Sequence, residues 1–548
     1  MVKTYTNPVY AFRRPPELDG ASTRRPIVIV GAGPVGLVAA IDLAQRGEPV
    51  VVLDDDSTVS VGSRAICYAK RTLEILDRLG CGERVTSRGV RWNVGKVFFG
   101  DSLAFRFDLL PEPGHRRPAF VNLQQYHFEE CLVDRARALG VELRWHNRVT
   151  GVAPSVDGAR VSVQTPDGDY AIDADWLIVA DGARSTVRKL MGLESEGQVF
   201  RDRFLIADLH MTSECPTERW FWFDPPFHRG QSVLLHRQSD NVWRIDFQLG
   251  WEADPDEERK PENIVPRLRA MLGPDARFEI EWASVYTFQC RRMKRFRHGR
   301  VLFAGDAAHL VSPFGARGAN SGMQDAENLA WKIDLVVRGL APDRLLDSYD
   351  EERLFAADEN IRHSTRATDF ITPKSAVSRT FRDGVLELAR DNPFARKLVN
   401  SGRLSTPTVL ASSPLNTPDR DDDFARGESA MVPGAPAVDA PVRSVQGEWL
   451  LANFPGVFTL LAFGAVVPAE DAARLARAPI PCGIVQVGGA PVAHSVHVED
   501  VDGLAASRYD ARGGTCYLLR PDQHVCARWR AFDRRAVEAA IARATCNE

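Results

Sequence analysis

The alternation of apolar and polar stretches is most regular between Pro26 and Asp54. An apolar run predicts a strand, the sequence Gly31-Ala-Gly-Pro-Val-Gly36 predicts a tight turn, and an Ala/Leu-rich stretch up to Gly47 predicts a helix. A second apolar run, which predicts another strand, then ends at Asp54. A strand, turn, helix and strand within about thirty residues have the size of one βαβ unit.

The residue types within this unit favour a bound dinucleotide. Gly31 permits the turn, Gly33 lets a pyrophosphate approach the N–H groups at the helix start, and Gly36 lets the helix lie close to the strand. Asp54 can accept hydrogen bonds from both ribose hydroxyls of an adenosine. A purely structural turn would explain the glycines alone, but the acid at the expected distance favours a Rossmann-like site for a dinucleotide of unspecified kind.

A second glycine-rich stretch lies near the middle of the chain. A buried strand is expected to end at Gly305-Asp306, a loop with several glycines follows, and a long helix is expected from about Ser321 to Val337. Free N–H groups and the positive end of the helix dipole suit a phosphate or an electron-rich ring carbonyl. Because Asp306 can hold a ligand hydroxyl, this loop is a candidate second half of the nucleotide site.

Changes in composition divide the chain into five parts. Residues 25–195 and 291–404 are expected to form one nucleotide-binding domain, the second part with bracing helices. Strands rich in Trp and Phe at 196–290 predict an antiparallel sheet inserted between them. Residues 405–441, rich in Pro, Ser and Asp, are expected to be a linker, and 442–548 show a compact pattern of strands and helices. The predicted fold class is therefore α/β.

Composition narrows the possible partners. The chain has 548 residues, of which 26% are charged and 44% hydrophobic, and a formal net charge of -4. We therefore expect no nucleic-acid partner and no membrane association. The nine cysteines form no CxxC pair and no metal-ligand spacing, which indicates a reducing compartment and no metal site. With no apolar run of signal-peptide or membrane-span length, the expected location is cytoplasmic.

Together these stretches resemble the FAD-dependent aromatic hydroxylases, the para-hydroxybenzoate hydroxylase-like flavoprotein monooxygenases. The glycine motif, the Asp181-Gly182 motif with Arg188, and the Gly305-Asp306 motif occur in the order that this family has. The resemblance covers about residues 25 to 400 and is greatest for the 3-(3-hydroxyphenyl)propionate hydroxylase branch and its polyketide-hydroxylase cousins. Asp54 stands where many members have Glu, and either residue accepts ribose hydroxyls.

The resemblance implies FAD as the cofactor, with NADH or NADPH as a transient co-substrate. It implies that O2 forms a flavin C4a-hydroperoxide that hydroxylates a phenolic ring, and 3-(3-hydroxyphenyl)propionate or a related phenol of aromatic catabolism is the expected substrate. A larger polycyclic aromatic or polyketide, or an FAD reductase or epoxidase acting on a non-phenolic substrate, stays open. The expected assembly is a homodimer.

The resemblance also implies site residues. The residues that it places against the flavin are Gly31, Gly33, Gly36, Asp54, Arg64, Gln125, Asp181, Gly305, Asp306, Pro313, Gly315, Gly318, Ala319 and Asn320. Pro313, whose carbonyl faces the substrate pocket in the family, and Arg64 are the catalytic candidates, although alone Arg64 would be a surface arginine. The substrate-binding candidates, each also explicable as core packing, are Trp220, Trp222, His236, Arg244 and Tyr286, with His236 or Arg244 expected to pair with a carboxylate.

The last part of the chain resembles the thioredoxin-like domain of many such hydroxylases. The segment after its first predicted strand, Gly464 to Pro468, reads GAVVP and contains no cysteine. Dithiol chemistry is therefore not expected there, and a structural or subunit-contact role is the better hypothesis.

Overall fold

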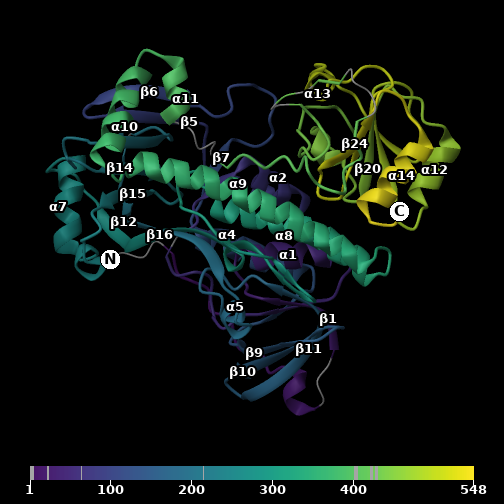
Figure 1. Ribbon diagram of the computed structural model, residues 1–548, viewed down its shortest axis with the longest axis horizontal. Coiled ribbons are helices and arrows are strands. Elements are labelled where there is room, and N and C mark those ends of the chain that lie inside the picture. Colours follow the sequence, from purple (N-terminus) through teal and green to yellow (C-terminus); the bar gives the residue numbers. More distant parts are fainter. Residues whose placement is uncertain are drawn as a thin grey trace.

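The computed structural model describes residues 5–20, 24–62, 64–213, 215–399, 405–419, 424–425, 427 and 430–548. Figure 1 shows a nucleotide-binding sheet, a second large sheet and a C-terminal unit, with the long helices α8 and α9 running between them. No helix within these ranges is both long and apolar enough to cross a membrane.

The nucleotide-binding sheet has eight strands around a parallel core. β1 pairs in parallel with β2 and β11, β2 with β8, and β11 with β18. The strands β9, β10 and β17 extend it by antiparallel pairing. The bounds are β1 (Arg24–Val30), β2 (Val50–Leu53), β8 (Glu142–Arg144), β9 (Arg148–Pro154), β10 (Ala159–Thr165), β11 (Gly168–Val179), β17 (Arg297–His298) and β18 (Val301–Phe303).

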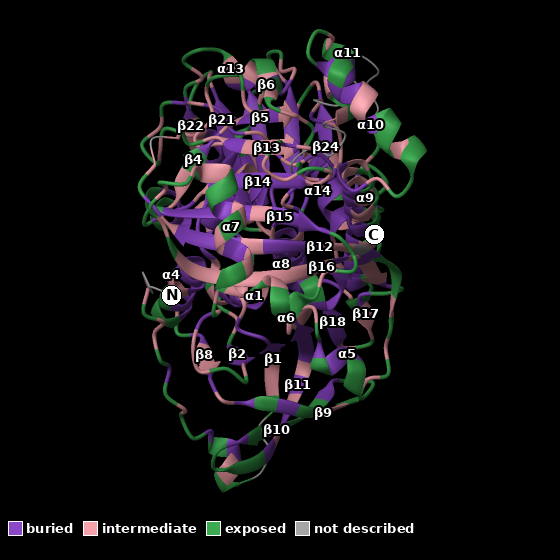
Figure 2. Ribbon diagram, turned by 90° about the vertical axis from the view of Figure 1, so that its left-hand side faces the viewer, coloured by how far each residue is buried: buried purple, intermediate pink, exposed green. Residues whose placement is uncertain are grey.

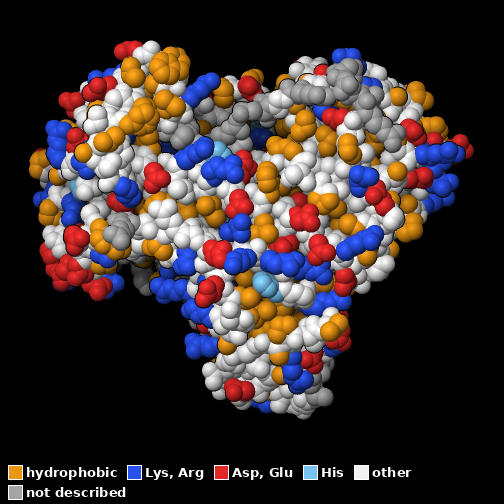
Figure 3. Space-filling model, viewed as in Figure 1, with side chains coloured by type: hydrophobic (Ala, Val, Ile, Leu, Met, Phe, Trp, Pro, Cys, Tyr) orange, Lys and Arg blue, Asp and Glu red, His pale blue; other side chains and the backbone are white. Residues whose placement is uncertain are grey.

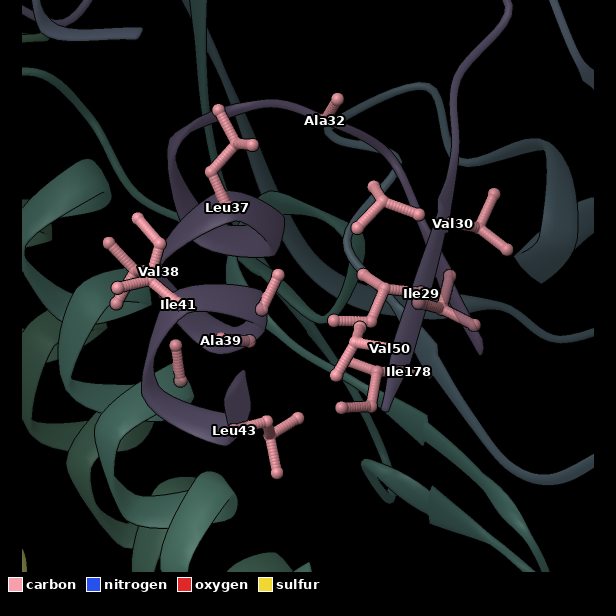
Figure 4. Packing of buried hydrophobic residues seen from close by; sticks show 14 of the residues in the cluster. Ile29, Val30, Ala32, Leu37, Val38, Ala39, Ile41, Leu43, Val50 and Ile178 are labelled. Carbon is pink, nitrogen blue, oxygen red and sulfur yellow. The ribbon is translucent and has the colours of Figure 1, made fainter. Parts of the chain in front are cut away.

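Helix α1 is buried along most of its length because the sheet covers one side and α4 and α8 cover the other. Figure 4 shows Ala39 and Leu43 of α1 on the side that faces Ile29, Val50 and Ile178 of the sheet. The helices around this core are α1 (Pro34–Gln45), α2 (Lys70–Arg78), α3 (Gly82–Arg88), α4 (Gln125–Ala138), α5 (Thr186–Leu190), α8 (Gly318–Val337) and α9 (Asp347–Ile371), with η1 (Pro16–Asp19), η2 (Gly305–Ala307) and η3 (Asp343–Leu346). Apolar contact on both sides explains the Ala/Leu-rich sequence of α1.

The second sheet also has eight strands, in the order β19-β16-β12-β15-β14-β13-β5-β6. Its bounds are β5 (Val94–Phe99), β6 (Ser102–Asp108), β12 (Ser195–His210), β13 (Arg219–Phe223), β14 (Ser232–Arg237), β15 (Val242–Leu249), β16 (Glu279–Met293) and β19 (His309–Leu310). The hairpin β5–β6 precedes the stretch 196–290 and joins the sheet by parallel pairing of β5 with β13. The sheet therefore extends beyond the inserted stretch, because the alternating hairpin covers an otherwise open edge.

Smaller elements complete this part of the molecule. A three-stranded sheet combines β3 (Cys67–Ala69), β4 (Val90–Trp92) and β7 (Phe120–Asn122), and α6 (Pro255–Glu258) and α7 (Pro261–Leu272) lie between β15 and β16 in the sequence. Helices α10 (Ala376–Ala389) and α11 (Pro393–Val399) lie at the end near β6. Figure 2 shows buried residues concentrated in the second sheet and exposed ones on α10, α11 and β9–β10. Figure 3 shows apolar side chains gathered at the α10–α11 end. Phe381 of α10 and Phe394 of α11 are both largely exposed.

The C-terminal unit contains a five-stranded mixed sheet in the order β22-β21-β20-β23-β24. Its elements are η4 (Leu450–Asn453), β20 (Phe458–Phe463), α12 (Ala469–Ala476), β21 (Cys482–Val487), β22 (Ser495–Val498), α13 (Leu504–Arg508), β23 (Cys516–Leu519), β24 (Val525–Trp529) and α14 (Arg534–Ala544). All nine cysteines of the protein are free thiols. A thioredoxin-like relationship for this unit stays a prediction.

A buried ionic cluster joins the C-terminal unit to the helices of the nucleotide-binding part. Arg520 donates to Glu352 of α9 (2.5 Å) and to Asp522 (2.6 Å), and Lys332 of α8 donates to Glu352 (2.8 Å). Trp331 of α8 donates its indole N–H to Asp522 at 3.1 Å. Because these four charged residues are almost fully buried, removal of one partner leaves an uncompensated charge.

Candidate active site

A cavity of about 800 Å³ lies between the nucleotide-binding strands and one face of the second sheet. The residues that follow β1, β2, β11 and β18 reach it, among them Gly31, Asp54, Asp181 and Asp306. Parallel α/β sheets bind their ligands at this edge, outside the carboxyl ends of the strands. The topology therefore brings the three sequence motifs together.

The glycine motif combines close packing with open space. Gly31 has φ +105°, and a Cβ on it would lie 2.5 Å from the carbonyl oxygen of Ala180. A Cβ on Gly36 would lie 2.0 Å from the carbonyl oxygen of Gly31, so α1 can approach β1 only with glycine there. By contrast, a Cβ on Gly33 would meet nothing within 4 Å, and Gly33 lines the cavity at the start of α1. This opening fits a pyrophosphate on the free N–H groups of the helix.

Asp54 is held at the end of β2 by the backbone. Its Oδ2 accepts from the Ala32 N–H at 2.5 Å, and its Oδ1 accepts from the Asp56 N–H at 2.9 Å. Burial raises the pKa of the Asp54 carboxyl to about 6, and these two hydrogen bonds oppose that increase. The carboxylate keeps lone pairs that face the cavity, where ribose hydroxyls can donate to them.

The Asp181-Gly182 and Gly305-Asp306 loops are fastened to each other. Arg188 donates to the carbonyl oxygens of Ala307 (2.6 Å) and Ala183 (3.0 Å). Asp181 accepts from the Val187 N–H at 3.0 Å, while its buried Oδ1 has no hydrogen-bond partner among the described residues. An acceptor of this kind beside the cavity fits a ligand hydroxyl.

Asp325 on α8 fixes the second loop from behind. Its carboxylate accepts from the Gly305 N–H (2.9 Å), from His309 (2.7 Å) and from Arg353 (2.6 Å). Burial favours the neutral carboxyl, but His309 and Arg353 lower its pKa well below the usual value. Asp306 faces the cavity, and burial raises the pKa of its carboxyl. The loop is thus held by an anchored acid, while a second acid remains available to a ligand.

The predicted ring-binding loop divides into residues that line the cavity and residues that hold the loop. Pro313, Gly318, Ala319 and Asn320 line the cavity. The Asn320 side chain accepts from the Ala69 N–H (2.8 Å) and donates to the carbonyl oxygens of Cys67 (2.9 Å) and Ala316 (2.5 Å). Asn320 therefore fastens the loop to β3 instead of directing its amide toward a ligand.

Arg64 and Gln125 also border the cavity. Gln125 accepts from the Ala65 N–H at 3.1 Å and donates to Glu129 at 2.8 Å, so it ties the segment after Arg64 to α4. Three predicted cofactor residues do not line this cavity. Gly36 and Gly305 are buried behind it in close contacts with neighbouring atoms, and Gly315 lines a smaller adjacent cavity.

The substrate side of the cavity is one face of the second sheet. Of the predicted substrate residues, His236, Arg244 and Tyr286 lie on this face, from three different strands. By contrast, Trp220 and Trp222 line neither the large cavity nor the smaller one beside it. Trp222 stacks on Phe98 with 5.2 Å between ring centroids and contacts Phe227 on the opposite face. Side-chain alternation along β13 sends its odd-numbered residues to the other face, where Arg219 lines the large cavity and Phe221 and Phe223 line the smaller one.

Neither Arg244 nor His236 offers the unpaired positive charge that was expected to bind a substrate carboxylate. Arg244 donates to Asp208 through Nε (2.7 Å) and Nη2 (2.8 Å), so its charge is already paired. Burial, together with Arg219 and Arg244, lowers the pKa of His236 well below its usual value, which keeps the imidazole neutral. Burial raises the pKa of Tyr286, so this phenol stays protonated and can donate.

Several cavity residues were missed because nothing local marks them. They include Cys67, Arg184, Phe204, Arg219, Leu234, Asp246, Phe288 and Phe314. The period-two pattern of β13 to β16 was a usable signal, since it groups Arg219 with Phe221 and Phe223 and sets the tryptophans apart. The strand pattern alone does not indicate which of the two faces of the sheet meets the cavity.

Comparison with known proteins gives the same assignment as the motifs. Residues 24–364, more than half of the chain, match the family model described as FAD binding domain. The 12-dehydrotetracycline 5-monooxygenase/anhydrotetracycline 6-monooxygenase of Streptomyces rimosus subsp. rimosus is 29% identical over 531 residues, 92% of this chain and 95% of the relative. A 3-(3-hydroxy-phenyl)propionate/3-hydroxycinnamic acid hydroxylase from Mycolicibacterium smegmatis is 30% identical over 68% of this chain and 66% of the relative.

Solved structures agree over nearly the whole chain. The flavin-dependent monooxygenase PieE, in complex with FAD and substrate, has the same fold with a TM-score of 0.82 at 21% identity, covering 96% of this chain and 100% of that one. The OxyS anhydrotetracycline hydroxylase from Streptomyces rimosus has a TM-score of 0.68 at 28% identity, covering 92% and 96%. The predicted α/β fold class and the predicted FAD cofactor are confirmed. The chain belongs to the FAD-dependent aromatic hydroxylases, a family of flavoprotein monooxygenases.

Proposed function

We propose that the protein uses NADH or NADPH and O2 to hydroxylate a phenolic aromatic ring. The observation that carries this proposal is a single cavity in which the three nucleotide motifs face the aromatic and cationic face of the second sheet. A cofactor held on one side and a ring held on the other would be close enough to react. A cavity with nucleotide motifs on all sides would instead favour a regulatory nucleotide site.

Bound FAD supplies the redox chemistry, since it accepts a hydride from NAD(P)H and activates O2. We assign Gly33 to the pyrophosphate, Asp54 to the adenosine ribose, and Asp181 and Asp306 to further hydroxyls of the cofactor. Gly31, Gly36 and Gly305 shape the loops, and we assign residues 313–319 to the flavin ring system. Arg64 is assigned to the edge of the flavin. The second sheet covers the reacting atoms and excludes water.

The size of the substrate separates two candidates. The relative from Mycolicibacterium smegmatis is a hydroxylase of 3-(3-hydroxyphenyl)propionate, whereas the Streptomyces relative, matched over almost its whole length, acts on a tetracycline. We propose 3-(3-hydroxyphenyl)propionate as the first substrate to test and a polycyclic phenol as the second. The substrate residues that we assign to either ring are His236, Arg244 and Tyr286.

The decisive experiment measures NADH and NADPH oxidation in air by the purified, FAD-containing protein, with and without each phenol. A substrate-stimulated rate and a product heavier by one oxygen atom are expected. Unstimulated oxidation that yields only hydrogen peroxide with every phenol would contradict the proposed phenol hydroxylation and favour a reductase or epoxidase. Light scattering on the same sample tests the homodimer that we propose as the assembly.

A further inference from the structure

Arg219, at the start of β13, is a buried cation that the proposed mechanism has not used. Its exposed fraction is 9%, and burial lowers the pKa of its guanidinium. Within the part of the chain that the structure describes, no hydrogen-bond acceptor and no carboxylate within 4.0 Å contacts this guanidinium. Because a buried charge without a partner is costly, such a group indicates that a ligand supplies the partner.

Arg219 lies where two cavities meet. It lines the large cavity and also a smaller one of about 80 Å³, and Phe314, next to Pro313, is likewise shared by both. Phe221 and Phe223 follow on the same face of β13 and line the smaller cavity with further phenylalanines. An oxygen bound at Arg219 would therefore lie between the predicted ring-binding loop and the smaller, apolar cavity, which we call the apolar recess.

The other polar groups on this face do not neutralise Arg219. Arg244 is paired with Asp208, His236 is neutral, and burial raises the pKa of the Cys67 thiol to about 11. Asp246 is the carboxyl that acts electrostatically on Arg219, but no ion pair joins the two among the described residues, and its Oδ2 lies 4.0 Å from Nε2 of the neutral His236. The positive charge at the junction of the cavities is thus offset only at a distance.

Asp246 is itself incompletely satisfied. Its Oδ1 is buried and has no hydrogen-bond partner among the described residues, and burial raises the pKa of the carboxyl to about 6. Arg219 and Asp246 both line the large cavity and lie on neighbouring parts of one sheet face. One unpaired donor group and one unpaired acceptor suit a ligand that carries both an anionic oxygen and a hydroxyl.

We propose that Arg219 binds an anionic oxygen of the substrate, from an ionised phenol or enol or from a carboxylate, while Asp246 accepts a hydrogen bond from a hydroxyl of the same molecule. This inference rests on the proposed function, because it takes the large cavity as the site of the aromatic substrate. Charge-assisted hydrogen bonds to a guanidinium are short and strong, so this contact would decide which aromatics bind.

The test compares anions with neutral analogues of the same shape. The probes are 4-nitrophenol at a pH above its pKa against 4-nitroanisole, and 3-(3-hydroxyphenyl)propionate against its methyl ester. Dissociation constants come from the change in flavin absorbance of the FAD-containing protein. Arg219→Met is expected to weaken anion binding at least tenfold and neutral binding less than threefold, whereas Arg219→Lys retains a preference for the anions.

Arg237→Met is the matched control. Arg237 lies on the neighbouring strand β14 but on the opposite face, where its guanidinium is 5.6 Å from the Trp243 ring. This variant should bind both members of each pair as the unmodified protein does. If Arg219→Met weakens binding of the 4-nitrophenol anion tenfold but leaves binding of the propionate unchanged, the oxygen at Arg219 belongs to an ionised phenol. If it weakens binding of the propionate alone, that oxygen belongs to a carboxylate.

Equal weakening of anions and neutral analogues, or no binding of either anion by the unmodified protein, would overturn the inference. Retained FAD and its reduction by NADH are checked in every variant, and Arg219→Gln replaces any Met variant that loses the flavin. A protein that hydroxylates phenols with unchanged selectivity after Arg219→Met refutes only the anion site. A protein that never hydroxylates a phenol refutes the proposed function.

Discussion

The two sides of the large cavity differ in how they hold most of their polar groups. The exceptions are the Oδ1 of Asp181 on the cofactor side, which has no hydrogen-bond partner among the described residues, and Arg244 on the substrate side, which is paired with Asp208. On the cofactor side, Asp54 and Asp325 are bound to backbone N–H groups, and Arg188 bridges two loops. On the substrate side, Arg219 and the Oδ1 of Asp246 have no hydrogen-bond partner among the described residues. The cofactor side is therefore largely organised before its ligand arrives, whereas Arg219 and Asp246 on the substrate side depend on a ligand to complete their pairing.

The largest effect is expected from a substitution remote from the cavity. It tests whether the loops on the cofactor side need support from the C-terminal unit. Arg520→Met leaves Glu352 and Asp522 with too little positive charge in a buried cluster, so the free energy of unfolding should fall by about 3–5 kcal/mol. Urea denaturation of the FAD-containing protein measures this change. The control Arg443→Met removes an exposed ion pair with Glu499 and should cost less than about 1 kcal/mol.

If α8 transmits this defect, Arg520→Met should also release FAD more readily. An unchanged affinity for FAD, with the expected loss of stability, would show that the loops organise the cofactor side without help from the C-terminal unit.

Asp306→Ala should act directly on the cofactor side. A hydrogen bond from a cofactor hydroxyl to a carboxylate contributes about 1.5–3 kcal/mol, so FAD should bind roughly ten to one hundred and fifty times more weakly. Equilibrium dialysis of the apoprotein with FAD provides the measurement. Full flavin occupancy together with normal turnover of the Asp306→Ala variant would contradict the assignment of Asp306 to a cofactor hydroxyl.

A pH titration should separate the two sides. The pKa of Asp54 is raised to about 6, and ribose hydroxyls donate to its ionised form, so FAD affinity should fall as the pH decreases from 7 to 5. Asp54→Asn should remove most of this dependence at the cost of weaker binding at pH 7. Asp246→Asn should leave the dependence intact, since Asp246 is assigned to the substrate. If both substitutions reduced the pH dependence of FAD affinity equally, Asp54 and Asp246 would not act independently on the two sides of the cavity.

The smallest effect is expected in the apolar recess. Phe221→Trp places a larger ring beside a cavity of about 80 Å³, so a three-ring phenol such as 1,8-dihydroxyanthraquinone should bind roughly threefold more weakly. Binding of 4-nitrophenol and of FAD should not change. If the single-ring and three-ring phenols lose affinity equally, the recess has no part in accommodating larger substrates.

The cofactor side could be predicted because its signals are local. The glycines and Asp54 stand within one βαβ unit, and chain topology brings the later motifs to the same edge of the sheet. Asn320 was named from the sequence of its own loop, but its role in holding β3 depends on Ala69, a partner some 250 residues away that the loop sequence does not identify.

The substrate side was harder because its register is set by distant strands. Trp222 was a candidate because it is aromatic and lies on a predicted strand, but the face of β13 that meets the cavity depends on its pairing with β5 and β14, and a shift of one residue exchanges every side chain between faces. The pairing of β5 with β13 likewise joins segments that are far apart in sequence. The division into domains and the thioredoxin-like relationship of the C-terminal unit stay predictions.

The buried cluster at Arg520 has a consequence for biosynthesis. Arg520 follows its partner Glu352 by 168 residues, so the ribosome delivers α8 and α9 long before the guanidinium that completes their charge balance. Until then the nascent chain carries polar helix faces that belong inside the finished molecule. Arg520 and Asp522 lie in the turn between the antiparallel strands β23 and β24. We expect the nucleotide-binding part to remain loosely packed during translation and to gain its final rigidity only when this hairpin docks.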